Sequence, residues 1–421
     1  MKKTVWILNH YASNMYLVGG GRHFSLAKYL KQNGYNPLVF CSNYDHFTQK
    51  YCVDGGDLYI EKQEPVTDIP YVFIKTRPYA GNGFDRILNM LDFYRGMLKT
   101  AKRFAKKNGA PDVIYASSVH PLTLVAGIRL AKHFGVKCIS EVRDLWPESI
   151  VAYSSRWTRD NPVMRILYAG EKWIYKKSDV VVMTWAGGYD YIRDRGWQKD
   201  IPETKVVHIS NGVDLEPYVS NIHEHPYVDD DLMDETHKCF AYAGSVRKVN
   251  NLAVLVQAAR VLKEMGDTAA RILIYGDGDE LEVLRREAAA QNLDNIIFKG
   301  RVLKHFVPSI LSQAYASILH NSSTALNKYG QSQNKFFEYL AAGHPILMTY
   351  SVGHSVIKER GCGIELETQS PESIAQAIHT LCTLTEEEYR NYCQRAAECA
   401  KEFDYKELCN LLISVIDQCL A

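Results

Sequence analysis

One stretch in the second half of the sequence combines a glycine turn with cations, a pattern typical of anion binding. Gly244 is followed closely by Arg247 and Lys248. Two cations beside such a turn suit a pyrophosphate, because an arginine binds phosphate oxygens bidentately and the N–H groups of the turn point at the anion. An exposed basic turn without a ligand is the alternative interpretation.

A second stretch, residues 330–345, places a small polar loop in front of a predicted helix. Gly330, Ser332 and Asn334 lead into that helix, Lys335 follows, and Glu338 lies about one turn further on. A carboxylate at this position can accept both hydroxyls of a ribose, while loop N–H groups and Lys335 face phosphate. The pattern therefore favours a site for ribose and phosphate groups.

Charged residues also follow two predicted strands of the first half. In the stretch 141–149, Asp144 and Glu148 either hold sugar hydroxyls or form a salt-bridged turn capped by Trp146. His120 comes after another strand and just before a helix. It either donates to a phosphate or sugar oxygen or caps the helix without chemistry.

Two further turns have the residue types for nucleotide contact. Gly20 and Gly21 open the first predicted helix, where glycine lets a phosphate approach the backbone. The spaced G-x-G-x-x-G fingerprint is absent, so a ligand contact and a flexible turn stay equally open. After a strand of the second half, Arg301 and Val302 mark a place where a flat base can lie against the backbone and Val302.

No pattern of metal ligands stands out in the sequence. Asp277 and Asp279 suggest a metal site, but Gly-Asp-Gly after a strand is a common turn, and acids suit the first turn of a helix. The ten cysteines form no C-x-x-C pair. That pattern is typical of reduced thiols in a cytoplasmic protein. We therefore expect neither a metal ion nor another cofactor.

Alternating strands and helices must position these residues. The alternation occurs twice along the chain, which predicts two parallel, doubly wound sheets of the α/β class. Open parallel sheets bind ligands at the carboxyl ends of their strands, and the candidate residues follow such strands. We predict two Rossmann-like domains, residues 1–212 and 213–395, with a ligand cleft between them. Residues 396–421 form a helix expected to pack back on the first domain, and the polar stretch 210–237 is predicted to be a linker.

Length and composition exclude several classes of protein. The 421 residues are too many for one compact domain. Of these residues 46% are apolar, which excludes a chain that is mainly disordered or mainly a nucleic-acid-binding tail. No apolar run reaches the length that spans a bilayer, and the run after Lys3 is too short for a signal peptide.

The charge is distributed unevenly. Residues 1–210 carry 30 Lys and Arg against 19 Asp and Glu, whereas the remainder carries 19 against 29. A basic first half predicts an anionic partner for that half. Two predicted helices, 85–107 and 164–177, combine apolar residues with lysines and arginines. They suit an anionic membrane surface, or they pack in the core with solvated basic faces.

With these residues in these positions, the sequence resembles the retaining family-four glycosyltransferases, which have the GT-B fold. The resemblance is closest to bacterial transferases of the N-acetyl-fucosamine type that build O-antigen and capsule. It spans nearly the whole chain. The pieces that carry it are the glycine loop 19–21 and the segments 141–149, 211–214, 244–248, 276–278, 300–302 and 332–345.

The resemblance implies a role for each candidate residue. The catalytic group would be His120, Arg247, Lys335 and Glu338, with His120 near the transferred sugar, Arg247 on the pyrophosphate and Glu338 on the ribose. The acceptor would lie beside Asp144 and Glu148. The remaining donor contacts would come from Gly20, Gly21, Gly244, Lys248, Arg301, Val302, Gly330, Ser332 and Asn334.

The same resemblance implies an activity. It is the metal-independent transfer of a hexose, N-acetylated or 6-deoxy, from a UDP-sugar with retention of anomeric configuration. The acceptor would be a saccharide or a polyprenyl-pyrophosphate-linked sugar of cell-surface polysaccharide synthesis. The protein would be cytoplasmic and peripheral on the inner face of the plasma membrane, with no nucleic-acid partner. Cations and helix N-termini would stabilise the leaving diphosphate, which itself accepts the proton of the acceptor.

Two positions depart from the family pattern. Gly330 stands where the family often has a glutamate that contacts the donor sugar, and Asn250 and Asn251 follow Lys248 where a lysine is expected. Backbone N–H groups near Gly330 are the expected replacement. Two alternatives stay open: a UDP-sugar epimerase of the same fold, and a catalytically degenerate sugar-binding partner. The missing fingerprint argues against a nicotinamide oxidoreductase.

Overall fold

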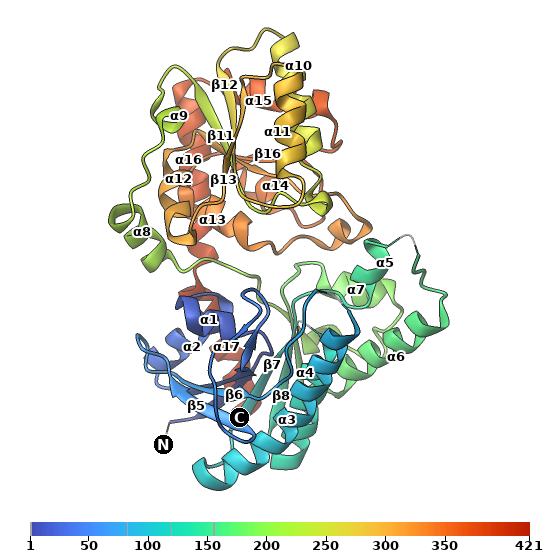
Figure 1. Ribbon diagram of the computed structural model, residues 1–421. Coiled ribbons are helices and arrows are strands. Elements are labelled where there is room, and N and C mark those ends of the chain that lie inside the picture. The colour runs from blue at the N-terminus through green and yellow to red at the C-terminus, as the bar shows by residue number, and fades with distance from the viewer. Residues whose placement is uncertain (1, 82, 119, 155) are drawn as a thin grey trace. The chain divides into compact units, whose positions relative to one another are not determined.

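The chain folds into two compact units, which are visible in the ribbon of Figure 1. The structure, a computed structural model, describes residues 2–81, 83–118, 120–154 and 156–421. The first unit contains the chain up to Ser210 together with Tyr405–Ala421, and Asn211–Asp404 form the second unit.

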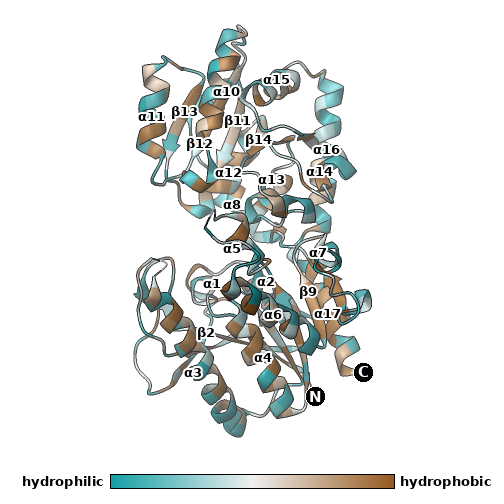
Figure 2. Cartoon of the chain, turned by 90° about the vertical axis from the view of Figure 1, so that its right-hand side faces the viewer, coloured by the Kyte–Doolittle hydropathy of each residue, from teal (hydrophilic) through white to brown (hydrophobic). Residues whose placement is uncertain are grey.

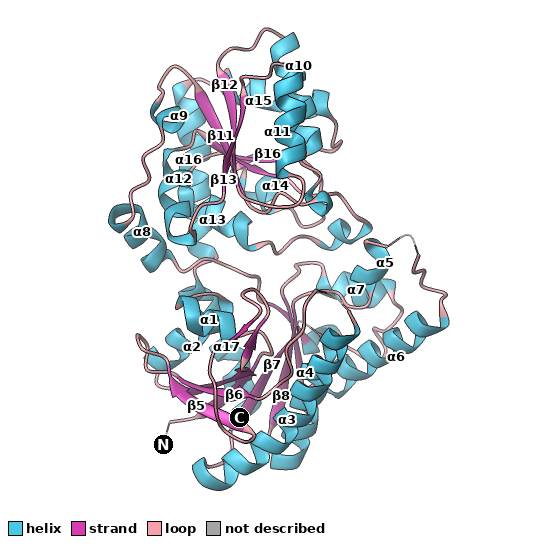
Figure 3. Ribbon diagram, viewed as in Figure 1, coloured by secondary structure: helices cyan, strands magenta, loops and turns pink. Residues whose placement is uncertain are grey.

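The first unit is built on a sheet with the strand order β10-β9-β8-β7-β1-β2-β6-β5. All neighbours pair in parallel except β5, which runs antiparallel to β6. A short hairpin of β3 (Tyr44–Asp45) and β4 (Lys50–Tyr51) lies outside this sheet. The strands, magenta in Figure 3, are β1 (Thr4–Leu8), β2 (Asn36–Ser42), β5 (Tyr59–Gln63), β6 (Pro70–Ile74), β7 (Val113–Ser117), β8 (Lys137–Val142), β9 (Val180–Met183) and β10 (Val206–His208).

Helices cover both faces of this sheet because successive side chains of a strand point to opposite faces. In β1, Val5 and Ile7 pack in a core with residues of α2 and α17. Trp6 packs instead against Phe104 and Phe134, on α3 and α4. The helices of this unit are α1 (Ser13–Val18), α2 (Arg22–Gln32), α3 (Phe84–Asn108), α4 (Pro121–Phe134), α5 (Glu148–Ala152), α6 (Pro162–Lys177), α7 (Gly188–Asp194) and α17 (Tyr405–Leu420), with the 3-10 turn η1 (Glu203–Lys205).

The second unit has an all-parallel sheet with the order β13-β12-β11-β14-β15-β16. One core packs α10, α11 and α15 on the sheet, and a second core packs α12, α13 and α16. The strands are β11 (Lys238–Ala243), β12 (Ala270–Tyr275), β13 (Ile296–Gly300), β14 (Ala316–Leu319), β15 (Ile346–Met348) and β16 (Gly363–Glu365). The helices are α8 (Leu215–Glu224), α9 (Asp230–Met233), α10 (Ala253–Glu264), α11 (Leu281–Ala290), α12 (Val307–Gln313), α13 (Asn334–Ala342), α14 (Val356–Arg360), α15 (Pro371–Cys382) and α16 (Glu386–Glu402), with the 3-10 turns η2 (Lys248–Asn250), η3 (Lys304–Phe306) and η4 (Ala325–Tyr329).

These observations confirm the predicted fold class of two doubly wound, mainly parallel sheets. The hydropathy colours of Figure 2 show the amphipathic helices α3 and α4 banded in brown and teal. No helix in the described ranges is both long enough and apolar enough to cross a membrane.

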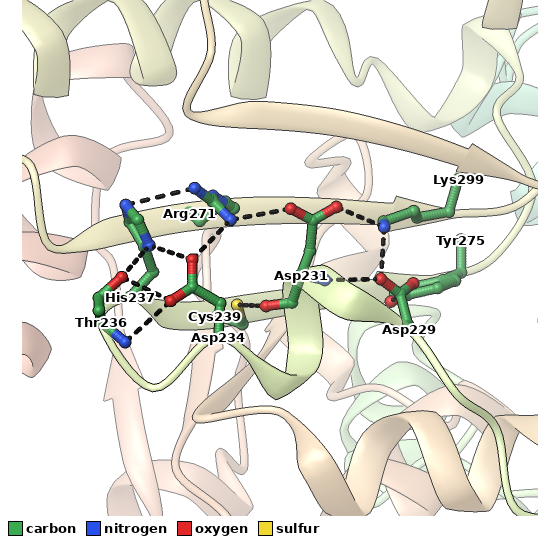
Figure 4. Close-up of polar contacts among 9 residues, drawn as sticks. All are labelled: Asp229, Asp231, Asp234, Thr236, His237, Cys239, Arg271, Tyr275 and Lys299. Atoms are coloured by element: carbon green, nitrogen blue, oxygen red, sulfur yellow. Dashed lines mark hydrogen bonds and ion pairs between the residues drawn. The ribbon is translucent and has the colours of Figure 1, made fainter.

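The stretch predicted to be a linker is folded onto the second unit. Tyr218 of α8 is buried in the core of that unit. Beside α9, Lys299 of β13 lies between Asp229 and Asp231, at 2.5 Å from a carboxylate oxygen of each (Figure 4). Arg271 of β12 also contacts Asp231, at 2.8 Å. These ion pairs fix α9 to the edge of the sheet, so the prediction of a linker over 210–237 is wrong.

The C-terminal return begins later than the predicted position 396. Residues up to Glu402 continue α16, whose Ala396, Cys399 and Ala400 are buried in the second unit. Only α17, from Tyr405, packs on the first unit, against α2. The predicted boundary at 212 also moves, because Asn211 already belongs to the second unit.

Candidate functional site

The turns that follow β11, β12 and β13 lie backbone against backbone. The amide of Gly244 donates to the carbonyl of Tyr275 at 2.9 Å, and the amide of Gly276 donates to the carbonyl of Gly300 at 2.8 Å. A Cβ on Gly276 would stand 1.7 Å from the Gly244 carbonyl oxygen. Glycine at 276 is therefore a packing requirement, and it holds the Gly244 turn in place.

The predicted cations Arg247 and Lys248 lie just after this turn, at the start of η2. Both side chains are exposed. Neither forms an ion pair or hydrogen bond with another residue that the structure describes. They are thus available to an anion at the carboxyl edge of the sheet.

Lys335 lies near the same turn, in the first turn of α13. Its ammonium group donates to the carbonyl oxygen of His320 at 2.8 Å and lies 4.6 Å from the centre of the Tyr242 ring. No carboxylate within the described part of the chain pairs with it. Burial lowers the pKa of Lys335 to about 7. A phosphate bound beside this amine would place a negative charge next to it and so favour the protonated form.

Glu338 lies one turn further along α13, and its carboxylate pairs with Lys304 of η3. The glutamate side chain is 18% exposed and the lysine 74%. This pair brings the loop after β13 beside α13, and the loop also carries Val302, which is half-buried against the core. The structure therefore places the predicted base-binding and ribose-binding residues close together.

The loop that precedes α13 is tied down at several points. Asn211 donates from its backbone to Ser332 Oγ at 3.1 Å, and its side-chain amide donates to the Ser332 carbonyl at 2.7 Å. Gly330 has φ 99°, a conformation that favours glycine. Asn334, at the start of the helix, and Arg301 are both exposed.

In the first unit, the predicted glycine loop is positioned by a buried ion pair. Gly21 precedes α2, and Arg22 of its first turn donates from Nε to Glu141 at 2.6 Å. Glu141 is the next-to-last residue of β8, and it also accepts hydrogen bonds from His23 at 2.8 Å and from Tyr115. The charges of Arg22 and His23 outweigh the effect of burial, so the pKa of Glu141 lies well below its usual range.

His120 and Asp144 both line one pocket of the first unit. His120 is buried, and its Nε2 lies 2.6 Å from Nδ1 of His10. Burial, with the nearby charge of Arg86, lowers the pKa of His120 to about 3, so its ring is neutral. Asp144, which also lines the pocket, is exposed.

Glu148, the other predicted acceptor residue, is buried and already paired. Its carboxylate accepts from Arg159 Nε at 3.0 Å and from the hydroxyl of Tyr168. This pairing favours the salt-bridged interpretation of Glu148, which the sequence left as the alternative. A sugar hydroxyl would have to displace an arginine from a charge-assisted bond.

Sequence reasoning missed three residues of these sites. Tyr242 and His320 hold Lys335, and each lies at or just after a strand end, where other candidates were sought. Glu171 lines the pocket of the first unit together with His120. Its only signal was an acidic residue within the apolar face of the predicted helix 164–177.

Comparison with known families gives the class of the protein. Residues 19–217 match the family model described as Glycosyltransferase Family 4, and residues 237–383 match the model described as Glycosyl transferases group 1. The chain thus carries the two domains of a GT-B glycosyltransferase. No curated protein matches it in sequence.

Solved structures share the fold at low sequence identity. Sucrose-phosphate synthase from Thermosynechococcus elongatus has a TM-score of 0.70 at 15% identity, covering 99% of both chains. Anabaena HepE in complex with UDP has 0.68 at 14%, covering 99% of this chain and 100% of that one. The UDP-forming α,α-trehalose-phosphate synthase from Burkholderia vietnamiensis has 0.69 at 12%, covering 100% and 99%.

Proposed function

We propose that this protein is a retaining, metal-independent hexosyltransferase that uses a UDP-sugar. The observation that carries the proposal is Lys335, a cation at the start of a helix and close to the Gly244 turn, which pairs with no carboxylate among the described residues. Glu338 lies on the same helix and would hold a ribose, and Val302, in the loop that Lys304 joins to Glu338, would flank a base. The UDP complexes and UDP-forming activity of structural neighbours support this proposal.

The chemistry follows from where charge develops. As the bond from the sugar to UDP breaks, negative charge grows on the departing diphosphate. Lys335, Arg247 and the free N–H groups of α13 lie where they can stabilise that charge, so no metal ion is required. The leaving phosphate then takes the proton of the attacking hydroxyl, and the new glycosidic bond forms on the face that UDP leaves.

Titration calorimetry with UDP tests the nucleotide site. We expect Arg247→Ala, Lys335→Ala and Glu338→Ala each to weaken binding about tenfold or more, because each removes a charge-assisted hydrogen bond. The matched control is Arg260→Ala, an exposed arginine of α10 that forms an ion pair with Glu264 on the same helix. UDP affinity that is equal in all four variants and the unaltered protein would contradict the proposed site.

A panel of UDP-sugars with saccharide and lipid-pyrophosphate acceptors tests the reaction itself. Turnover should persist in EDTA, and NMR of the product should show the anomeric configuration of the donor. Epimer formation without an acceptor would identify the alternative epimerase instead.

We also propose that the acceptor is lipid-linked and that the protein binds an anionic membrane surface through α6. This helix exposes Val163, Ile166 and Trp173 beside Arg165, although Asp200 neutralises two of its lysines. Apolar side chains next to free cations suit the boundary of an anionic leaflet. By contrast, α3 uses its apolar face in the core, so the core-packing interpretation is favoured for that helix.

Sedimentation with phosphatidylglycerol vesicles tests this surface. We expect Ile166→Glu to reduce binding about tenfold, since the change removes apolar contact and adds a like charge. Val283→Glu on α11 is the matched control, an exposed valine in the second unit. Binding that is insensitive to Ile166→Glu, or equal on neutral vesicles, would refute the proposal.

A second candidate function, a catalytically degenerate sugar-binding partner, is favoured by one observation. Gly330 replaces the glutamate expected from the family, and its φ of 99° strains any other residue. UDP-sugar binding without turnover on any acceptor of the panel would support this candidate.

A further inference from the structure

The turn that carries the two exposed cations of the second unit ends in a left-handed residue. Arg247 precedes η2 and Lys248 begins it, and the amide of Asn251 closes the turn by donating to the Lys248 carbonyl at 3.1 Å. Asn251 has φ 53°, a conformation that asparagine adopts more readily than most residues but still at a cost in free energy. Such a turn keeps its shape only where the surrounding structure holds it.

Two side chains that follow β14 hold the backbone of this turn. Nε2 of His320 lies 3.0 Å from the carbonyl oxygen of Asn251. Ser322 donates from Oγ to the Val249 carbonyl at 2.6 Å. The main chain at the same place meets Lys335, whose ammonium group donates to the His320 carbonyl at 2.8 Å. One short segment therefore contacts both parts of the chain that carry candidate phosphate-binding cations.

The hydrogen bonds of His320 fix which ring nitrogen carries the proton. A carbonyl oxygen only accepts, so Nε2 is the donor to Asn251. Burial lowers the pKa of His320 to about 4, so the ring is neutral at pH 7, and Nδ1 accepts from the Thr349 hydroxyl at 2.7 Å. Gln369 donates in turn to the Thr349 hydroxyl oxygen at 3.3 Å. Because both ring nitrogens are used and the residue is fully buried, the ring holds its neighbours and does not itself meet a ligand.

We propose that His320 is a positioning residue of the diphosphate site, whose ring and carbonyl hold the η2 turn and Lys335 in place before a ligand binds. Ser322 supports the same turn. The inference rests on the proposed function, in which Arg247 and Lys335 bind the diphosphate of UDP, and it names what holds these two cations. Cations that are already in position lose little freedom on binding, so they contribute more to affinity than mobile ones.

Two substitutions at position 320 separate the contacts of the ring. The side-chain amide of glutamine reaches the position of Nε2, so His320→Gln keeps a donor for the Asn251 carbonyl and loses the acceptor for Thr349. Asparagine is shorter, and its amide oxygen takes the position of Nδ1. His320→Asn therefore keeps the Thr349 contact and leaves the Asn251 carbonyl without its donor. Each variant leaves one polar group unpaired, so we expect similar losses of thermal stability in the two.

Titration calorimetry with UDP and with uridine measures the effect at the phosphate end. We expect His320→Asn to bind UDP about tenfold more weakly than the unaltered protein, and uridine equally well, because uridine has no diphosphate. His320→Gln should bind both ligands within about twofold of the unaltered protein. General damage to the second unit would instead lower the affinity for both ligands in both variants, and that result would overturn the inference.

A milder pair of variants keeps the inference testable if His320→Asn does not fold. Ser322 is only half-buried, and Ser322→Ala removes its hydrogen bond to the Val249 carbonyl, whereas Ser322→Thr keeps a hydroxyl. We expect Ser322→Ala to weaken UDP binding about threefold and leave uridine binding unchanged. Ser322→Thr should match the unaltered protein, and a loss that it shares with Ser322→Ala would contradict a role for this hydrogen bond.

The outcomes distinguish this inference from the proposed function. UDP binding that is equally strong in the unaltered protein, His320→Asn and Ser322→Ala overturns the inference and leaves the proposed function standing. Selective loss of UDP affinity in these variants, in a protein that transfers no sugar, supports the inference and refutes the transferase activity. An unaltered protein that binds no UDP refutes both.

Discussion

At the residue scale, the proposed nucleotide site depends on a lysine that is poorly solvated. Lys335 is held by a carbonyl oxygen and an aromatic ring, which do not compensate an ammonium charge as a carboxylate does. Because burial is not compensated by a carboxylate, the pKa of Lys335 is lowered to about 7. Binding of a diphosphate beside Lys335 is therefore coupled to the uptake of a proton from solution whenever the free amine is neutral.

This proton uptake predicts a pH dependence of UDP affinity. Between pH 7 and pH 9 the dissociation constant of UDP should rise by up to about tenfold per pH unit. The reason is that the protonated fraction of Lys335 in the free protein falls as the pH rises. UDP itself stays fully ionised over this range, since the last phosphate pKa is about 6. Calorimetry at several pH values measures the effect.

The control for this pH profile is Lys335→Arg. A guanidinium stays charged at all these pH values, so the profile should become nearly flat even if the affinity changes overall. A steep profile that survives in this variant would assign the titration to another group.

At the element scale, the site is formed by turns stacked at one edge of a parallel sheet. The turn after β12 supports the turn after β11 through main-chain contacts, and both its glycines leave no room for a side chain. Asp277 lies between Gly276 and Gly278, so its backbone is part of this packed turn. Residues far apart in sequence thus set the shape of the Gly244 turn.

Gly276→Ala tests this stacking. The added methyl group overlaps the Gly244 carbonyl, so we expect a loss of about 1–3 kcal/mol in the stability of the second unit and a weaker UDP site. Thermal unfolding and UDP titration measure both effects. Gly170→Ala on α6 is the contrasting change, because nothing lies within 4 Å of its added methyl group. That variant should be neutral or stabilised by about 0.5–1 kcal/mol.

At the scale of the whole molecule, the chain completes the first unit with its last helix. The residues of α17 that face α2 and the sheet are buried, and they close the core around Leu26 and Leu30. The first unit is therefore complete only after the second has been synthesised. The stability of the first unit should therefore depend on buried side chains of α17 about as strongly as on those of β1 and β2, its first strands in the sequence.

Adjacent leucines of α17 provide the test. Leu412→Ala removes a fully buried side chain and should cost about 2–5 kcal/mol, with faster hydrogen exchange in β7 and β8. Leu411 is 49% exposed, so Leu411→Ala should change stability by no more than about 0.5 kcal/mol. Equal effects of the two substitutions would show that α17 does not complete this core.

The sequence by itself determined the fold class and most of the candidate nucleotide site. Both follow from local patterns: alternating strands and helices, and polar residues directly after strands. The structure confirmed two mainly parallel sheets, and Gly244, Lys335, Glu338 and Val302 all lie in the second unit. Parallel strands bring their carboxyl ends to one edge, so residues after them meet without further information.

Only the tertiary structure decided which charges were free. Glu148 and Asp144 look alike in sequence, yet one is buried against Arg159 and the other is exposed. Glu171 has no distinguishing local pattern in the sequence, yet in the structure it is a buried acid that accepts hydrogen bonds from Tyr175 and Tyr191. Burial and pairing depend on side chains from distant segments, because desolvation and ion pairing act through space and leave no trace in local spacing.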